Sequence, residues 1–254
     1  MKTVIVIPSY NEAGNIVDAI QRVLAVASDC HALVVDDNSP DGTADLVSDL
    51  AATNPRVHLL CRVDDRGLGT AVRDGFLEAL RLGAELVGQM DADGSHDPAD
   101  FARMAALINN GTADVVIGSR YLTGSRIEGW NWLRYTNSWF ANVLRRTIVR
   151  LPIADATNGL RLFRRDVLET IALPRLMSRG YSVIIETNYR AHRAGYRLRE
   201  IPTTFHPRRA GQSKMAFREV VRFCWLLVQL RFRVPAGKPP TAEDRSNNNL
   251  TKAA

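Results

Sequence analysis

The sequence predicts a single α/β domain with a mostly parallel central sheet and helices on both faces. Three observations lead to this fold class. The 254 residues can bury one sizeable core. Short apolar runs alternate with amphipathic segments through the first half of the chain, which is the pattern of repeated strand and helix. Polar clusters follow the apolar runs, at the strand ends where such sheets bind ligands.

Five apolar runs predict buried strands, and they cover residues 3–7, 32–35, 57–61, 86–90 and 115–117. The first run follows a single lysine and is shorter than a secretory h-region, so it predicts a strand rather than a signal peptide. Apolar residues at helical spacing predict helices within 16–27, 72–80 and 101–108. Asp97 and Pro98 predict the N-cap and the first-turn proline of the third helix.

The end of the chain predicts a basic C-terminal helix over 214–233, followed by a disordered tail over 235–254. The longest apolar stretch of the helix, 223–230, is far shorter than the roughly 20 residues that span a bilayer. Arg218, Arg222, Gln229 and Arg233 fall near one face, and aromatic or aliphatic residues occupy the others. Two interpretations stay open: a helix at a membrane interface, or a terminal helix packed on the sheet.

Cysteine spacing and charge narrow the function classes. Cys30, Cys61 and Cys224 lie far apart, which argues against a disulfide framework or a zinc site and suits a reducing compartment. Residues 1–119 carry a net charge of −10 and residues 120–254 one of +16. This asymmetry favours an acidic half that holds a cation and a basic half that holds phosphates or an anionic membrane, although a basic surface that aids solubility has the same composition. The chain has no recognised nucleic-acid-binding motif, so we expect no nucleic-acid partner.

The strongest chemical motif is Asp91-Ala92-Asp93, directly after the fourth predicted strand. Two carboxylates at this spacing can share one Mg²⁺ or Mn²⁺ with diphosphate oxygens, and the ion then offsets the charge on a departing nucleotide diphosphate. A dinucleotide fingerprint is excluded, because the glycine that should follow Gly67 and Gly69 is replaced by Val72. These two glycines instead predict that the loop and the following helix pack closely near the bound nucleotide diphosphate and its sugar. His96 is expected to hydrogen-bond within the loop rather than to bind metal.

Several motifs, in the order PSYNE, DDNSPDGT, GLGTA, DADGSH, GSRY, TNGLR and RRAGQSK, together resemble the polyprenol (dolichol) phosphate mannose synthases. These are inverting family 2 glycosyltransferases with a GT-A fold, and the resemblance runs over residues 3–214. It implies one GT-A domain over 1–234, with a nucleotide-sugar-binding half (1–119), an acceptor half (120–213) and the amphipathic helix (214–234). It also implies GDP-mannose as donor and a polyprenyl phosphate as acceptor.

The resemblance assigns residue roles, and they fall into three groups. The donor group is Pro8, Tyr10, Glu12, Asp36, Asp37, Gly69, Asp91, Ala92, Asp93, Arg208 and Lys214. The acceptor phosphate is assigned to Arg120, Arg134 and Ser138, and the metal to Asp91, Asp93 and Ser95. Ser95 stands where relatives often carry glutamine. Asp91, Asp93 and Arg120 are the expected catalytic residues, whereas Glu186 is expected to orient arginines or to pack.

The chemistry of the acceptor supports this interpretation independently. A phosphate monoester is mostly dianionic near pH 7, since its second pKa is about 6, so it attacks without a general base. It does require cations, and residues 120–165 contain nine arginines against Glu128 and Asp155. Arg145, Arg146 and Arg150 are candidates for a merely solvated face. Two alternatives keep the same fold: another donor such as UDP-glucose, or a hydroxyl acceptor that requires a general base. Two others are not enzymes: a catalytically silent protein that binds nucleotides, or a basic adaptor that binds membranes.

The expected location is the cytoplasmic face of a membrane, with the protein bound peripherally. Attachment would then depend on the lipid substrate, on the basic helix or on a membrane-spanning partner protein.

Overall fold

The structure is a computed structural model that describes residues 1–127, 143, 145–206 and 217–234. It is a single α/β domain around a seven-stranded sheet of order β3-β2-β1-β4-β7-β5-β8. The strands are β1 (Thr3–Ser9), β2 (Cys30–Asp36), β3 (Val57–Cys61), β4 (Leu86–Gln89), β5 (Val115–Ser119), β7 (Arg161–Arg164) and β8 (Leu198–Pro202). All five predicted strands are confirmed, and the sheet is mostly parallel as predicted.

The exception to the parallel sheet is β7, which runs antiparallel to both of its neighbours, β4 and β5. Because of this reversal, the start of β7 lies beside the end of β4, with Arg161 paired to Gln89. The segment before β7 therefore reaches the same edge of the sheet as the loops that follow the parallel strands. A separate two-stranded sheet pairs β6 (Arg126–Ile127) with β9 (Thr204–Phe205).

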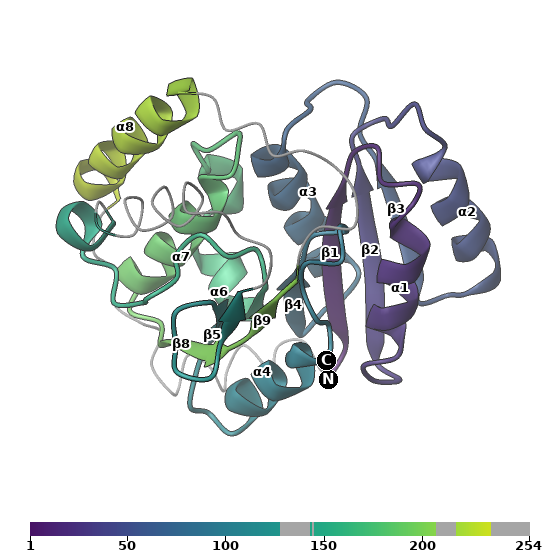
Figure 1. Cartoon of the computed structure of the whole chain (residues 1–254), viewed down its shortest axis with the longest axis horizontal. Coiled ribbons are helices and arrows are strands. Elements are labelled where there is room, and N and C mark those ends of the chain that lie inside the picture. Colours follow the sequence, from purple (N-terminus) through teal and green to yellow (C-terminus); the bar gives the residue numbers. More distant parts are fainter. Residues whose placement is uncertain (128–142, 144, 207–216, 235–254) are drawn as a thin grey trace, which may run out of the picture.

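Helices cover both faces of the sheet, and alternating strand residues divide the core between them. Val4 and Val6 of β1 point to one face, and Ile5 and Ile7 point to the other. The first core contains residues of α3 (Leu68–Arg81), α6 (Arg165–Thr170), α7 (Val183–Arg193) and α8 (Phe217–Arg233), and the second residues of α1 (Ile16–Leu24), α2 (Thr43–Thr53) and α4 (Asp100–Asn109). Figure 1 shows β1–β3 with α1 and α2 on the right and α7 and α8 on the left.

The predicted helices are confirmed, with one shift at the start of α4. The helix begins at Asp100 rather than next to Pro98. The Asp97 carboxylate accepts a hydrogen bond from the Ala99 N–H at 3.1 Å, and the Asp97 carbonyl accepts one from Asp100. Residues 97–100 therefore form a hydrogen-bonded turn that precedes the helix, so Asp97 caps this turn instead of the helix.

The C-terminal helix α8 has two faces. Leu226, Leu227 and Leu230 are buried in the first core, and the helix packs on the π-helical turn η1 (Arg145–Val149). Trp225 and Phe232 are 62% and 82% exposed. The helix thus packs on the domain through η1 and the first core rather than flat against the sheet, and Trp225 and Phe232 stay exposed. None of the helices within the described ranges combines the length and the apolar character needed to cross a bilayer. The predicted tail over 235–254 lies outside the described residues.

Candidate active site

A pocket of about 200 Å³ opens where β1, β2 and β4 end and α3 begins. Its wall contains most of the predicted donor residues, namely Pro8, Tyr10, Glu12, Asp37, Asp91, Ala92 and Asp93. Each lies at or just after the end of a buried parallel strand, and the carboxyl ends of these strands meet at one edge of the sheet. The structure therefore brings together residues that lie up to 85 positions apart in the chain.

The two aspartates of the DAD motif lie in this wall, and hydrogen bonds within the loop after β4 fix the motif. The N–H of Asp91 donates to Nδ1 of His96 at 3.2 Å, so His96 forms the loop hydrogen bond that was expected of it. Asp93 accepts from the N–H of Ser95 at 3.0 Å. Gly159, just before β7, lies so close that a Cβ there would be 3.0 Å from Oδ1 of Asp91. A side chain at 159 would therefore require Asp91 or His96 to shift by a few tenths of an ångström.

The residues around the DAD motif fit a divalent cation. Asp91 and Asp93 supply hard oxygen ligands, and the Ser95 hydroxyl is buried with no hydrogen-bond partner in the described part of the structure. A buried hydroxyl of this kind suits a site in which it binds a metal ion or a bridging water, neither of which is part of the protein. The described residues contain no group of three or more His, Cys, Asp or Glu arranged to hold a metal alone. This donor set suits Mg²⁺ or Mn²⁺, which share their coordination sphere with substrate phosphates and water.

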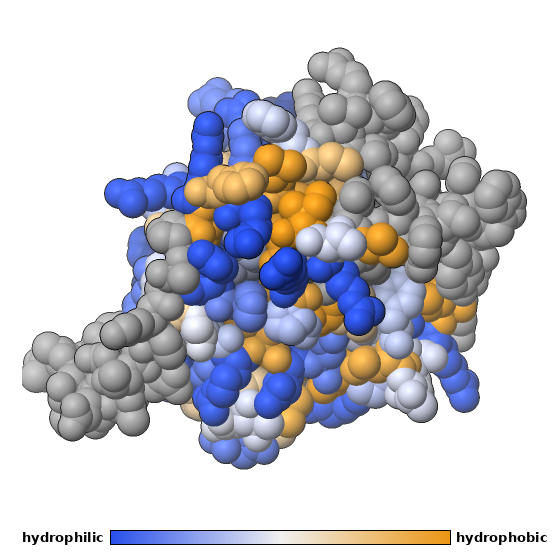
Figure 2. All heavy atoms as spheres, turned by 90° about the vertical axis from the view of Figure 1, so that its left-hand side faces the viewer, coloured by the Kyte–Doolittle hydropathy of each residue, from blue (hydrophilic) through white to orange (hydrophobic). Residues whose placement is uncertain are grey.

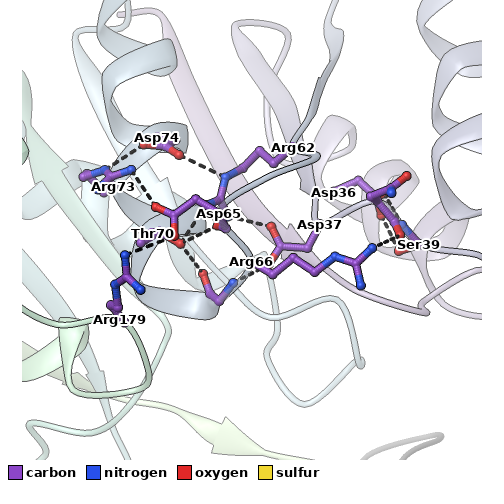
Figure 3. Close-up of polar contacts among 12 residues, drawn as sticks. Asp36, Asp37, Ser39, Arg62, Asp65, Arg66, Thr70, Arg73, Asp74 and Arg179 are labelled. Atoms are coloured by element: carbon purple, nitrogen blue, oxygen red, sulfur yellow. Dashed lines mark hydrogen bonds and ion pairs between the residues drawn. The ribbon is translucent and has the colours of Figure 1, made fainter.

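Asp37 lies at the centre of a polar network (Figure 3). Its Oδ1 accepts from Nη1 of Arg62 at 2.5 Å, and its Oδ2 accepts from the N–H of Gly67 at 2.8 Å. The same arginine donates to Asp74 on α3 at 2.9 Å and to Thr70 at 2.6 Å. Arg62 is itself almost fully buried. The network holds the Asp37 carboxylate at the pocket wall in one orientation.

Two of the predicted donor residues that the structure describes, Asp36 and Gly69, do not line the pocket. Asp36 is buried and accepts from both the N–H and the hydroxyl of Ser39, at 2.8 and 2.5 Å, so it shapes the loop that follows β2. Gly69 instead contacts a distant segment, because its N–H donates to the carbonyl of Arg179 at 2.9 Å. The close packing expected of the glycines therefore occurs, and its partner is this second-half segment.

Arg120 forms a buried ion pair that the sequence did not indicate. Its Nε donates to Oδ2 of Asp155 at 2.6 Å and its Nη2 to Oδ1 at 2.7 Å, a bidentate arrangement. Burial alone would lower the pKa of the guanidinium, but the Asp155 charge and its hydrogen bonds raise it. Asp91 also contributes to this rise, so Arg120 lies within electrostatic reach of the DAD motif. Arg120 remains a predicted acceptor residue, with Asp155 as its fixed neighbour.

The other arginines of the second half are engaged in different ways. Arg146 and Arg150 are exposed, as expected of a solvated face. Arg161 is fully buried and donates to neutral acceptors, which are Gln89, Thr187, Asn188 and the carbonyl of Ile184. Burial lowers the pKa of this guanidinium to about 9, so it stays charged at neutral pH inside the protein. It ties α7 to β4 two residues before Asp91.

Glu186 of α7 is also fully buried, and it pairs with Arg190 at 2.8 Å. The expected role in orienting an arginine is thus confirmed. The pocket wall also contains four residues without a predicted role: Ser9, Leu68, Ala71 and Tyr181. The first three lie within the motifs PSYNE and GLGTA, whereas Tyr181 comes from the second half. Arg134, Ser138, Arg208 and Lys214 were predicted to bind acceptor or donor and lie outside the described residues.

Comparison with known proteins agrees with this geometry. Residues 4–172 match the family model described as glycosyl transferase family 2. The chain is 42% identical over 216 residues to the polyprenol monophosphomannose synthase of Mycolicibacterium smegmatis. This match covers 85% of this chain and 81% of the relative. It is 38% identical over 216 residues to the undecaprenyl-phosphate mannosyltransferase of Micrococcus luteus, with 85% and 88% covered.

Solved structures show the same fold. Glucosyl-3-phosphoglycerate synthase from Mycobacterium tuberculosis, in complex with Mn²⁺, uridine diphosphate and phosphoglyceric acid, superposes with a TM-score of 0.66. The match covers 92% of this chain and 79% of that one, at 17% identity. At this identity the similarity concerns the fold alone. Together with the family match over two thirds of the chain, these findings show that the protein is a glycosyltransferase of family 2, with polyprenol phosphate mannose synthases among its relatives.

Proposed function

We propose that the protein transfers mannose from GDP-mannose to a polyprenyl phosphate, with inversion, giving polyprenyl phosphate mannose and GDP. The observation that carries the proposal is the pocket that Asp91 and Asp93 line together with Tyr10, Glu12 and Asp37. Its carboxylates suit a metal-bound diphosphate, and its other wall suits a nucleoside. The names of the two relatives support a polyprenyl phosphate acceptor and a mannosyl product.

Different residues of the pocket would perform different parts of this reaction. Asp91 and Asp93, with Ser95 beside them, would hold Mg²⁺ or Mn²⁺, which supplies positive charge to the departing diphosphate. Asp37 would accept hydrogen bonds from the base, since Arg62 and Gly67 fix its carboxylate. An acceptor phosphate oxygen forms the new bond to the anomeric carbon while the bond to the diphosphate oxygen breaks. No proton has to move, because the acceptor is already an anion.

Arg120 is the described residue best placed to bind the acceptor phosphate. It follows β5 at the same edge of the sheet as the pocket, and Asp155 holds its guanidinium in one orientation. A fixed, planar guanidinium binds phosphate without a further loss of side-chain freedom. Arg134 and Ser138 of the acceptor half, and Arg208 and Lys214 near the donor, are proposed as further phosphate contacts on the resemblance alone.

Membrane association is part of the proposal, because a polyprenyl chain lies in a bilayer. The exposed aromatic side chains of α8, Trp225 and Phe232, have the exposed Arg231 and Arg233 as neighbours on the same helix. Figure 2 shows apolar side chains gathered between strongly hydrophilic ones on this side of the molecule. Aromatic residues with neighbouring arginines suit the headgroup region of an anionic membrane. We therefore propose a peripheral protein on the cytoplasmic face, anchored by α8, by the lipid substrate or by a membrane-spanning partner.

The direct test is a transfer assay with labelled GDP-mannose, a polyprenyl phosphate and either Mg²⁺ or Mn²⁺. We expect a lipid-extractable product that disappears on chelation of the metal. Parallel reactions with UDP-glucose, and with a polyprenol in place of its phosphate, separate the alternative donor and the hydroxyl acceptor. The absence of product with every sugar nucleotide and polyprenyl phosphate tested would refute the proposal.

A matched pair of variants tests the metal assignment. Asp93→Asn keeps the side-chain shape but removes a charged ligand, and we expect turnover to fall at least a hundredfold with the melting temperature nearly unchanged. Asp97→Asn is the control, because Asp97 lies on the same loop, half-exposed, and pairs with Arg22 at 3.3 Å outside the pocket. Equal activity of the two variants would contradict the role of Asp93.

A further inference from the structure

The segment before α7 belongs to the second half of the chain but is packed against the donor side of the domain. Gly67 has a φ of +141° and leaves no room for a side chain, since a Cβ there would lie 2.8 Å from the carbonyl oxygen of Arg179. The same carbonyl accepts from the N–H of Gly69. Gly67 in turn donates to Asp37 at 2.8 Å. A continuous set of backbone contacts thus joins the segment to the wall of the donor pocket.

Glu186 holds this segment from the other side. Its carboxylate accepts from the N–H of Met177 at 3.0 Å, and from the N–H and hydroxyl of Ser178 at 2.9 and 2.6 Å. Arg190, one turn further along α7, supplies the compensating charge. A buried carboxylate with this many donors fixes the path of the backbone that it binds. Glu186 therefore sets where the chain goes between Met177 and the start of α7.

Tyr181 is the residue that this backbone path places in the pocket wall. It is 59% exposed, yet it lines the pocket next to Leu68 and Ala71 on α3 and Asp37 at the end of β2. Tyr10, 48% exposed, lines the same pocket from the end of β1. Large aromatic side chains left open to solvent in a polar pocket offer their π-faces to a planar ligand.

We propose that Tyr181 is a donor-binding residue that contacts the nucleoside part of the nucleotide sugar, and that Glu186 is the positioning residue that keeps it there. The inference rests on the proposed function only in taking a nucleotide as the ligand of the pocket. It extends the donor site beyond the first half of the chain. It also gives the buried Glu186 a purpose beyond its ion pair, since its other acceptor sites serve the backbone that leads to Tyr181.

Nucleotide binding measured by calorimetry tests Tyr181 without the lipid acceptor. The probes are GDP with Mn²⁺ and UDP with Mn²⁺, titrated into the wild type, Tyr181→Ala, Tyr181→Phe and the control Phe232→Ala. We expect Tyr181→Ala to weaken the binding of the better nucleotide about tenfold, the size of one base–aromatic contact. Tyr181→Phe should retain most of the affinity, and Phe232→Ala should match the wild type because Phe232 lies on α8 and does not line the pocket.

The outcomes separate this inference from the proposed function. A wild type that binds neither nucleotide would contradict the proposed function itself. A wild type that binds one of them, with Tyr181→Ala binding it equally well, would overturn the role of Tyr181 and leave the proposed function standing.

Glu186→Gln tests the positioning role through the separate KM values of the donor and the acceptor. An amide nitrogen cannot accept from Met177 and Ser178, so we expect the donor KM to rise about tenfold while the acceptor KM stays near its wild-type value. Glu169→Gln is the control, because it makes the same chemical change in a carboxylate that pairs with Arg165 across one helical turn on α6. A folded Glu186→Gln enzyme with wild-type donor KM would overturn the positioning role; if it does not fold, the Tyr181 variants decide, since that side chain is exposed.

Discussion

Replacing Asp155 by asparagine should destabilise the protein strongly, because it removes the charge that compensates Arg120. The two side chains are 8% and 0% exposed, and two hydrogen bonds of 2.6 and 2.7 Å join them. The N–H groups of Arg120 and Thr157 also donate to the Asp155 carboxylate. Asparagine preserves the shape but turns one oxygen into a donor that faces the guanidinium. Arg120 would then be a buried cation that has lost the compensating charge of Asp155.

The burial sets the magnitude of this effect. Breaking one partner of a buried ion pair costs about 3–5 kcal/mol, whereas exposed pairs are screened by solvent and contribute little. Native domains have unfolding free energies of about 5–15 kcal/mol, so the loss is a large fraction of the total. For a domain of this size the melting temperature should fall by roughly 6–20 °C.

Thermal and urea unfolding of matched variants provide the assay. Glu78→Gln is the control, since Glu78 forms an ion pair of 2.6 Å with Arg81, which is 74% exposed. We expect that control to melt almost like the wild type. A double variant, Arg120→Met with Asp155→Asn, should be more stable than the sum of the single changes predicts, because no uncompensated charge remains. If Asp155→Asn melts within 1–2 °C of Glu78→Gln, the reasoning from buried charge is refuted.

Two further predictions follow from the packing and the charges. Gly69→Ala should lower the unfolding free energy by about 1–3 kcal/mol and weaken nucleotide binding, because its Cβ would lie 2.6 Å from the backbone carbon of Arg179. The control in melting and titration experiments is Gly14→Ala, since a Cβ at Gly14 would have nothing within 4 Å. Acid unfolding should depend on Asp155: burial alone would raise the pKa of this carboxyl, but the charge and hydrogen bonds of Arg120 outweigh burial and lower it. Its stabilisation is therefore complete above the unfolded pKa of about 3.9 and is lost as pH falls through the lower folded pKa. Unfolding measured between pH 6 and 2 should show a shallower acid loss in Asp155→Asn, and an unchanged slope would contradict this assignment.

The strands that could be predicted from the sequence are those whose burial is visible in their composition. Residues 3–7 and 32–35 are continuous apolar runs because helices cover both faces of a parallel sheet. The strand β7 escaped prediction because half of its residues are arginines. Arg161 is buried there only because Gln89 and residues of α7 surround it with acceptors. Such a strand depends on partners from elsewhere in the chain, which local composition does not reveal.

The site residues likewise divide into those that the local sequence reveals and those that depend on distant parts of the chain. Tyr10, Asp37 and Asp93 could be predicted as donor residues because each lies in a motif of the resembled family that follows a strand, and the topology gathers those positions at one edge of the sheet. Tyr181 could not, because it reaches the pocket through tertiary contacts with Gly67 and Glu186. The sequence indicated only that Gly67 and Gly69, the two glycines after β3, pack closely against another part of the protein. It did not indicate that this part is the segment that carries Tyr181.

The arginine-rich stretch shows why net charge is a poor measure of a phosphate site. Among the described arginines of 120–165, Arg120 faces Asp155, Arg164 faces Asp114 and Asp166, and Arg165 faces Glu169. A paired guanidinium adds little to the long-range field, but it is held in place. Phosphate binding at Arg120 would therefore depend on the orientation that Asp155 imposes rather than on the excess of positive charge. The exposed Arg146 and Arg150 contribute that excess to the surface near α8, where a diffuse positive field would suit the anionic membrane that we propose as partner.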